Sequence, residues 1–344
     1  MDNASVLDSL VSGASHISVA VHTHPDGDAL GSGLALVGYL ARCRGKDAVL
    51  LVPDSVPQTL SFILKDFGGC PVKDCSDDPA GVFGRIAASD LLFCLDCSSF
   101  ARTGAMESHL REATAPKVLI DHHLSPDREA FGTVFSETEV SSTCELLLGI
   151  LKEMPDVHGD LRNLPDCSLR ALLTGITTDT NNFANSVFPG TLEAVQGLME
   201  AGVDRDAVLS DLYNHYRENR IRLMGYLLHE NLTVTPEGAA LMVLDRRIQK
   251  EFDFRQGETE GFVNLPLSID GVRLSIFLTE EDDRFRVSVR SKRGTSANAC
   301  ASRYFHGGGH ELASGGKLFF PGDIPSPEDA KAYILKVTRE FLKG

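Results

Sequence analysis

Short apolar runs alternate with segments of helical periodicity over the first 195 residues of the chain. The apolar runs have the length of strands, and the segments between them repeat apolar residues at the spacing of a helix. Strands are expected at residues 16–21, 48–52, 90–95 and 117–120, and helices at residues 29–44, 58–67, 141–154 and 168–178. Runs such as LLFCL and KVLI are apolar throughout, which indicates strands buried on both faces. The pattern predicts an α/β lobe built on a doubly wound, mostly parallel sheet.

The pattern changes after Asp204. A long helical pattern covers residues 206–231, and β-branched or alternating segments follow it: LTVTPEGAALMVLD, VRLSIFLTE and FRVSVRS. These segments predict a smaller α/β lobe with a more antiparallel sheet. We therefore expect a first domain at residues 1–200, a helical linker at residues 201–228 and a second domain at residues 229–344.

Length and composition agree with two folded domains. The chain has 344 residues, of which 42% are hydrophobic and 24% charged, and single cores usually stop growing at roughly 250–300 residues. The net charge of −15 disfavours a protein that coats long nucleic acid. One segment differs, because Arg284 to Arg303 contains six basic residues and no acidic one. It could hold a short anion, or it could be a solvated strand face; charge alone leaves both open.

The N-terminal residues MDNASVLDSLVSG lack a basic start and a long apolar run, and no later apolar run is long enough to span a membrane. We therefore expect a cytoplasmic protein that is neither exported nor membrane-bound. Its eight cysteines are scattered, which favours free thiols. Cys94 and Cys97 have the spacing of half a zinc site, but no second pair follows them, so buried thiols are the preferred interpretation.

Acidic and imidazole side chains follow the predicted strands. ISVAV continues into HTHPDGD, LLFCL into Asp96, KVLI into DHH, and the helix-like ALLTGI into TTDT, which contains Asp179. Each of these side chains alone could have an ordinary structural role. Asp28, for example, could cap the helix that follows it. However, the carboxyl ends of parallel strands share one edge of a sheet, where ligands bind. The repetition therefore predicts one site that gathers these side chains.

Carboxylates gathered so closely repel one another unless cations or protons intervene. Oxygen ligands mixed with imidazole nitrogens suit Mn²⁺, with Mg²⁺ as the alternative, better than a thiolate zinc site. Two such ions, held ~3.5–4 Å apart, would polarise a phosphoryl oxygen and activate a bridging water molecule. The chemistry that this predicts is hydrolysis of a phosphoester.

The motifs resemble those of a known family. HTHPDGDALGS, LDCSS, DHH and GITTDTNNF are similar, in order and spacing, to the four motifs of the DHH phosphoesterase superfamily. HGGGHELASGG is similar to the phosphate-binding motif of its C-terminal DHHA1 domain. The resemblance spans nearly the whole chain. It implies a catalytic DHH domain, a substrate-binding DHHA1 domain and an active site in the cleft between the domains.

The resemblance also implies roles for individual residues. The implied metal ligands are His22, Asp26 and Asp96 for one ion, and Asp28, Asp96, His122 and Asp179 for the second. Asp96 would bridge the two ions. Asp121 is expected to orient a neighbouring imidazole, and His123 to face the scissile phosphate. His24 occupies a variable position of the first motif and is given no role.

A second set of residues is expected to bind the substrate's distal phosphate: Arg290, Gly307, Gly308, Gly309 and His310. Glycines let backbone N–H groups approach an anion closely, although a glycine run alone would more often be a flexible turn. The chain departs from the family at His306, where the glycine run commonly continues. That departure puts the local backbone path in question.

Among family members, the length and the two domains most resemble the group that cleaves very short RNA and removes the 3′-phosphate from 3′-phosphoadenosine 5′-phosphate (pAp). We therefore expect a manganese-dependent oligoribonuclease and pAp phosphatase that does not act on long duplex nucleic acid. Linear or cyclic dinucleotides are alternative substrates, as are pyrophosphate and polyphosphate. A non-catalytic nucleotide sensor is the least favoured hypothesis, because every metal-ligand position of the family motifs is occupied by a suitable residue. A homodimer is the default expectation.

Overall fold

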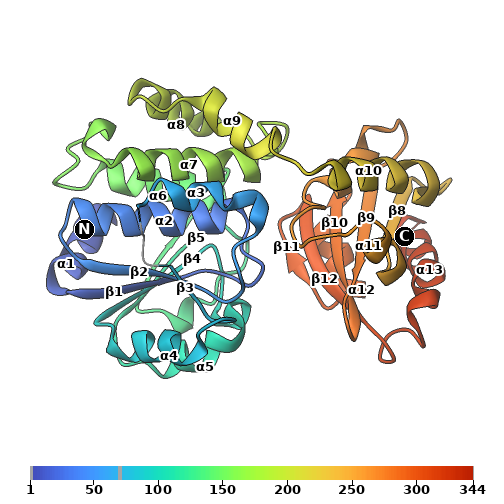
Figure 1. Cartoon of the computed structure of the whole chain (residues 1–344), viewed down its shortest axis with the longest axis horizontal. Coiled ribbons are helices and arrows are strands. Elements are labelled where there is room, and N and C mark those ends of the chain that lie inside the picture. The colour runs from blue at the N-terminus through green and yellow to red at the C-terminus, as the bar shows by residue number, and fades with distance from the viewer. Residues whose placement is uncertain (1–2, 69–71, 344) are drawn as a thin grey trace. The chain divides into compact units, whose positions relative to one another are not determined.

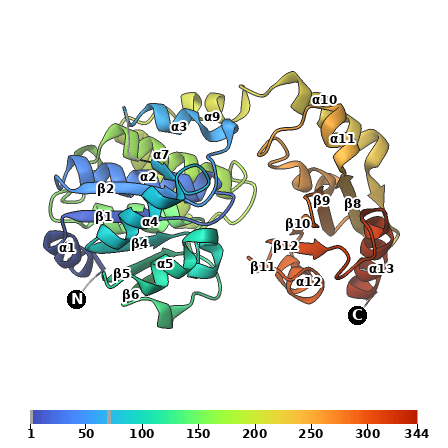
Figure 2. The same cartoon turned by 60° about the horizontal axis from the view of Figure 1, so that its bottom comes forward.

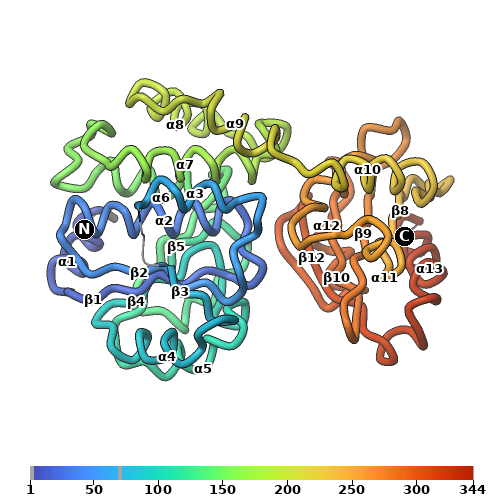
Figure 3. Tube along the Cα trace, in the orientation of Figure 1, coloured from blue at the N-terminus to red at the C-terminus, as the bar shows by residue number. Residues whose placement is uncertain are grey.

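The computed structural model describes residues 3–68 and 72–343, and these form two compact units divided between His215 and Tyr216. The helical pattern after Asp204 forms two helices, α9 (Arg205–Tyr213) and α10 (Glu218–Tyr226), one in each unit. Figure 3 traces the chain between them. The domain limits at residues 200 and 229 remain a prediction.

The first unit is built on a six-stranded parallel sheet. Its strands, in spatial order, are β3 (Val72–Asp74), β2 (Asp47–Val52), β1 (His16–Ala20), β4 (Leu91–Leu95), β5 (Lys117–Asp121) and β6 (Thr133–Ser136). The order reverses direction at β1, since β2 lies on one side of it and β4 on the other. The predicted doubly wound α/β fold is confirmed, and the reversal marks the edge at which such sheets bind ligands.

Helices cover both faces of this sheet (Figure 1). The larger layer contains α1 (Asn3–Gly13), α2 (Gly27–Arg42), α3 (Phe62–Lys65), α6 (Thr143–Lys152) and α7 (Asp166–Asp179). Helices α8 (Pro189–Glu200) and α9 pack on the outer side of this layer, against α7. The smaller layer contains α4 (Pro79–Ala88) and α5 (Glu107–Glu112). Along β4, Phe93 and Leu95 pack into the larger layer, whereas Leu92 and Cys94 pack into the smaller one. Burial on both sides explains why this strand is apolar throughout.

Helices α2 and α7 pack very closely because glycines lie at their contact. A Cβ atom at Gly31 would lie 2.6 Å from the Ala171 carbonyl oxygen and 3.0 Å from the Cys144 Sγ atom, and one at Gly175 would overlap the same sulfur. The close approach brings the first turn of α2, which carries Asp28, toward the end of α7, which carries Asp179. The helix packing thus helps to assemble the site described below.

The sequence pattern was less accurate at residues 58–67. The expected helix is a 3₁₀ turn, η1 (Gln58–Leu60), followed by the four-residue α3. Only Leu60, Ile63 and Phe67 of this segment are buried, and Thr and Ser are weak helix formers. The edge strands β3 and β6 were not expected, because they are short and half-exposed and lack a long apolar run.

The second unit contains a mixed six-stranded sheet. Its strands, in spatial order, are β11 (Gly308–Gly309), β12 (Ala313–Phe319), β10 (Arg284–Ser291), β9 (Leu274–Glu280), β8 (Ala239–Leu244) and β7 (Thr233–Val234). β8 and β9 are parallel, and the other neighbouring pairs are antiparallel. The expectation of a smaller, more antiparallel α/β lobe is confirmed.

Helices also cover this second sheet (Figure 2). One core joins the sheet to α12 (Ala297–Tyr304) and α13 (Ala330–Lys343). A separate core joins β8 and β9 to α10, α11 (Arg246–Glu251) and the short helical segments η5 (Leu227–Asn231) and η6 (Phe262–Ser268). Along β10, buried residues alternate with half-buried ones. The half-buried residues are on the side that faces away from the first of these cores.

Seven cysteines lie in the described part of the chain, and all seven are free thiols; Cys70 is outside it. Cys94 and Cys97 are fully buried next to each other, in agreement with the interpretation of buried thiols. Among the described residues, no helix has both the length and the apolar character needed to cross a membrane.

We predict that Gly31→Ala destabilises the protein, because the new methyl group would force α2 and α7 apart. The expected loss in the free energy of unfolding is about 1–3 kcal/mol. Gly149→Ala is the matched control: Gly149 is exposed on α6 with open space around it, so alanine should stabilise by about 0.5–1 kcal/mol. Urea denaturation of both variants measures the difference, and equal stabilities would contradict the packing argument.

Candidate active site

Three neighbouring strands deliver polar side chains to one edge of the first sheet. β1, β4 and β5 are adjacent, and the chain leaves them toward His22, Asp96 and His122. Asp96 has a positive φ of 57°, a conformation that is uncommon outside glycine, and its N–H group donates to the Ile120 carbonyl oxygen at 3.1 Å. The loop after β4 thus turns sharply and points Asp96 at its neighbours.

Two helix N-termini hold carboxylates at this edge. Asp26 caps α2, where its Oδ1 atom accepts hydrogen bonds from the backbone N–H groups of Asp28 and Ala29, both at 3.0 Å. Asp28 is buried and accepts from the N–H groups of Thr143 at 2.7 Å and Cys144 at 2.9 Å, which begin α6. Helix N-termini favour negative charge, so both carboxylates are fixed in place.

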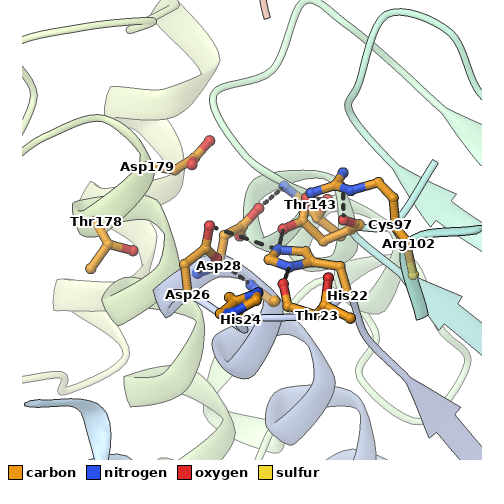
Figure 4. Close-up of polar contacts among 12 residues, drawn as sticks. His22, Thr23, His24, Asp26, Asp28, Cys97, Arg102, Thr143, Thr178 and Asp179 are labelled. Atoms are coloured by element: carbon orange, nitrogen blue, oxygen red, sulfur yellow. Dashed lines mark hydrogen bonds and ion pairs between the residues drawn. The ribbon is translucent and has the colours of Figure 1, made fainter. Parts of the chain in front are cut away.

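The His22 imidazole lies among these carboxylates (Figure 4). His22 Nε2 is 3.3 Å from Asp96 Oδ2 and 3.8 Å from Asp26 Oδ2. His22 Nδ1 is 2.8 Å from the Thr23 carbonyl oxygen, which can only accept, so Nδ1 donates there and Nε2 faces the carboxylates.

The second imidazole contacts three carboxylates. His122 Nε2 is 3.7 Å from Asp28 Oδ2, 3.5 Å from Asp96 Oδ1 and 3.4 Å from Asp179 Oδ2. The two oxygens of Asp96 therefore face different histidines. The structure brings together all six residues that the sequence suggested as metal ligands, in two groups that share Asp96.

Asp121 and His123 form a separate pair beside these groups. The Asp121 side chain is fully buried, and its Oδ1 atom lies 2.7 Å from His123 Nδ1. The imidazole that Asp121 contacts is therefore that of His123, which also lies 3.5 Å from Asp96 Oδ1. His24 instead lies near Asp54, 3.8 Å away, on the half-exposed side of its loop.

Burial and the nearby charges shift the pKa values of several groups in this cluster. The pKa of Asp28 is raised well above its ordinary value, first by burial and then by the nearby charges of Asp96 and Asp179. Burial would also raise the pKa of Asp96, but the hydrogen bond from His22 and the neighbouring imidazoles outweigh it and hold this pKa well below its ordinary value. Burial and Arg102 lower the pKa of His22, yet Asp96 and Asp26 leave it raised.

The donor set fits divalent cations. Asp26, Asp96 and His22 each offer a ligand atom within 4.8 Å of the others, and so do Asp28, Asp96 and His122. The nearest thiol, Cys144, keeps its proton, because burial raises its pKa well above the ordinary value. Carboxylate oxygens and imidazole nitrogens without a thiolate are the ligands that suit Mn²⁺ or Mg²⁺.

Sequence reasoning missed Thr143, although it touches both groups. Its hydroxyl donates to Asp96 Oδ1 at 3.0 Å, while its N–H group holds Asp28. The signal was present as the capping pattern of SSTCE, in which Ser142 caps α6 and accepts from the Glu145 N–H group. Glu145 Oε2 in turn accepts from Ser141 and Thr191, which secures the start of the helix.

Sequence reasoning also missed Arg102. It lies in the 3₁₀ segment η2 (Phe100–Met106), and its Nη1 atom is 3.0 Å from His123 Nε2. Only a basic residue six positions after Asp96 could have hinted at it, and that spacing carries no general meaning outside a structure.

In the second unit, the expected substrate-binding residues lie at one end of the sheet. Arg290 is half-buried on β10, and its Nη1 atom donates to the Val289 carbonyl oxygen at 3.1 Å. No carboxylate lies within 4 Å of its guanidinium in residues 3–68 and 72–343, whereas Arg284 and Arg286 on the same face both approach Glu281. Arg290 is thus the basic residue of β10 that lacks an acidic neighbour.

The glycine run does not form the expected anion-binding nest. Gly308 and Gly309 pair with β12 as a short strand, and the N–H groups of Gly307, Gly309 and His310 donate to Ala301, Asn298 and Ala313. The glycines are needed for close packing instead, since a Cβ atom at Gly307 would overlap the Gly315 carbonyl oxygen.

His306 continues the chain where the family commonly has glycine. It adopts the left-handed conformation with a φ of 48°, which glycine accepts more readily, and its Nε2 atom lies 2.9 Å from Asp323 Oδ1. His306 therefore adopts a conformation that glycine accepts readily, with its imidazole placed against an acidic neighbour.

Binding of Mn²⁺ should release protons and tighten as the pH rises. Asp28 holds its proton to a higher pH than an ordinary carboxyl group, so a cation must displace that proton below its raised pKa. Calorimetric titration of the metal-free protein between about pH 5 and pH 8, in buffers of different ionisation enthalpy, measures both effects. A constant affinity without proton release would show that Asp28 is already ionised.

Comparisons with known proteins agree with this geometry. The chain matches the N-terminal domain of the DHH family over residues 16–176 and the DHHA1 domain over residues 239–343. It is 28% identical over 302 residues to the bifunctional oligoribonuclease and PAP phosphatase NrnA of Bacillus subtilis, covering 87% of this chain and 88% of that protein. It is likewise 28% identical to the Thermus thermophilus protein of the same name, covering 88% of this chain and 84% of the relative.

A solved structure covers almost the whole chain. The exopolyphosphatase-related protein from Bacteroides fragilis is 30% identical and superimposes with a TM-score of 0.88 over 99% of this chain and 96% of its own. The chain therefore belongs to the DHH phosphoesterase family, whose members are hydrolases, with a DHH domain followed by a DHHA1 domain.

Proposed function

We propose that this protein is a cytoplasmic, manganese-dependent phosphoesterase that cleaves short oligoribonucleotides and removes the 3′-phosphate from pAp. The observation that carries the proposal is the pair of carboxylate and imidazole groups that share Asp96. Relatives named for both activities, at 28% identity over most of the chain, support the choice of substrate.

In this proposal the first domain holds two ions. We assign His22, Asp26 and Asp96 to one of them, and Asp28, Asp96, His122 and Asp179 to the other. Bound Mn²⁺, or Mg²⁺ in its place, would supply positive charge for the phosphoryl oxygens and make a water molecule more acidic. The chain's own contribution is to fix the ligands before substrate arrives: the first turns of α2 and α6 hold the carboxylates, and Thr23 orients His22.

Substrate contacts would come from both domains. We assign Asp121 and His123 to the reacting phosphate, with Asp121 fixing the orientation of the imidazole. We assign Arg290, with Gly307, Gly308, Gly309 and His310, to the distal phosphate. Because the N–H groups of Gly307 and Gly309 are used within the domain, Arg290 and His310 would supply this contact mainly through their side chains.

Hydrolysis of polyphosphate is a second candidate, favoured by the similarity to the exopolyphosphatase-related structure. A substrate panel of pAp, di- to pentaribonucleotides, cyclic dinucleotides, pyrophosphate and short polyphosphate separates the two. We expect pAp and the shortest ribonucleotides to have the highest kcat/KM. Faster cleavage of polyphosphate would replace the first proposal with the second, and binding of nucleotides without turnover would indicate a sensor.

Asp96→Asn should abolish turnover and lower the bound Mn²⁺, because an amide replaces the carboxylate shared by both ligand groups. The loss of activity should exceed the roughly 10–100-fold cost of losing an outer partner of a metal ligand. Asp206→Asn, at a carboxylate that is 96% exposed on α9, is the control and should change neither quantity. Metal content and turnover near the wild-type values in Asp96→Asn would refute the assignment of the shared ligand.

Arg290→Gln should raise KM for pAp by about tenfold or more and leave kcat within a few fold, because a charged hydrogen bond to the distal phosphate is lost. Arg303→Gln removes an exposed charge from the same basic segment and serves as the control. Steady-state kinetics at low salt measure both. An equal effect of the two substitutions would mean that only the general positive charge matters.

A further inference from the structure

Arg102 connects the three loops that build the active site. Its backbone carbonyl oxygen accepts a hydrogen bond from the Thr23 N–H group at 2.7 Å, in the loop after β1. Its Nη1 atom lies 3.4 Å from the Asp96 carbonyl oxygen, after β4, and 3.0 Å from His123 Nε2, after β5. The guanidinium is thus held at Nη1 by the loops after β4 and β5, and the Arg102 backbone is held by the loop after β1. Figure 4 shows Arg102 beside Thr23 and His22.

The contact with His123 has a defined direction. A guanidinium only donates hydrogen bonds, so His123 Nε2 is the acceptor. His123 Nδ1 is then the atom that carries the proton, and it donates to Asp121 Oδ1 at 2.7 Å. Asp121, His123 and Arg102 form a hydrogen-bonded series in which each residue orients the next. The series ends at Arg102, whose guanidinium is always charged.

The rest of the guanidinium has no partner within the protein. Across residues 3–68 and 72–343, no acceptor bonds to Nε or Nη2 of Arg102, and no carboxylate lies within 4 Å of its nitrogens. The Nε atoms of Arg85, Arg170 and Arg220 are buried and lack a hydrogen-bond partner in the described part of the chain. Nε and Nη2 of Arg102 also lack a partner there, but they are not buried in this way. These two donors are therefore open to solvent and to a ligand.

Nε and Nη2 of an arginine form a planar pair that matches two oxygens of a phosphate. We propose that Arg102 binds the scissile phosphoryl group through these two donors, an inference that rests on the proposed function. Arg102 would then be a catalytic residue that stabilises the negative charge growing on the phosphoryl oxygens. It would take the place of the direct phosphate contact assigned above to His123, and His123 and Asp121 would position it.

The test compares Arg102→Met and Arg102→Lys with the wild-type protein, all loaded with Mn²⁺. Arg102→Met should lower kcat by about 10²–10³-fold, the usual cost of removing one donor to a developing negative charge. Arg102→Lys keeps the charge but not the planar pair, so it should recover only part of this loss. Arg128→Met is the matched control, because Arg128 is exposed in the loop that follows the same strand β5.

Binding of inorganic phosphate to the Mn²⁺-loaded proteins provides a measurement that does not depend on turnover. Calorimetry should give an affinity at least about tenfold weaker for Arg102→Met than for the wild type or Arg128→Met. Bound Mn²⁺ and the melting temperature should stay at the wild-type values. A wild type that cleaves no phosphoester would overturn the proposed function, while the phosphate affinities would still decide the role of Arg102.

Two results would overturn the inference itself. The first is an active wild type together with an Arg102→Met variant that retains its kcat and its phosphate affinity. The second is loss of Mn²⁺ or a lower melting temperature in both Arg102 variants, with activity restored when Mn²⁺ is supplied in excess. That result would mean that Arg102 only braces the three loops.

Discussion

Four carboxylates and two imidazoles converge where the strand order of the first sheet reverses, and Asp96 belongs to both halves of this cluster. Negative charges this close together are stable only if something balances them. The protein supplies part of the balance itself, through the N-termini of α2 and α6 and the raised pKa of Asp28. The negative charge that is still unbalanced favours the binding of divalent cations. The loops and helix ends of the first domain are arranged so that these charged side chains are held together.

The packing of the helices serves the same requirement. The start of α2 carries Asp26 and Asp28, the end of α7 carries Asp179, and the glycines at their contact allow the two helices to approach. α6 carries none of the proposed metal ligands, yet Thr143 at its start touches both Asp28 and Asp96. Core packing and the chemistry of the site are therefore coupled through a few backbone and hydroxyl groups.

The parallel sheet and the gathering of carboxylates and imidazoles at one edge could be predicted from the sequence, because buried strands are apolar throughout and their ends share one edge. Which six of these side chains form the two groups was implied by the family resemblance. Thr143 and Arg102 could not, because their importance depends on which loops meet in space. Asp121 was expected to orient an imidazole, but only the folded structure shows that the imidazole is that of His123. The glycine run was expected to bind an anion through its N–H groups, whereas its conformation reflects close packing against β12.

The central claim is that Asp96 is shared by two bound cations. Diffraction from crystals grown with Mn²⁺, measured at the manganese absorption edge, tests it most directly. The account predicts two anomalous peaks, one beside His22 and Asp26 and the other beside Asp28 and His122, with an oxygen of Asp96 coordinating each ion. A single peak, or two peaks of which neither is coordinated by Asp96, would contradict it.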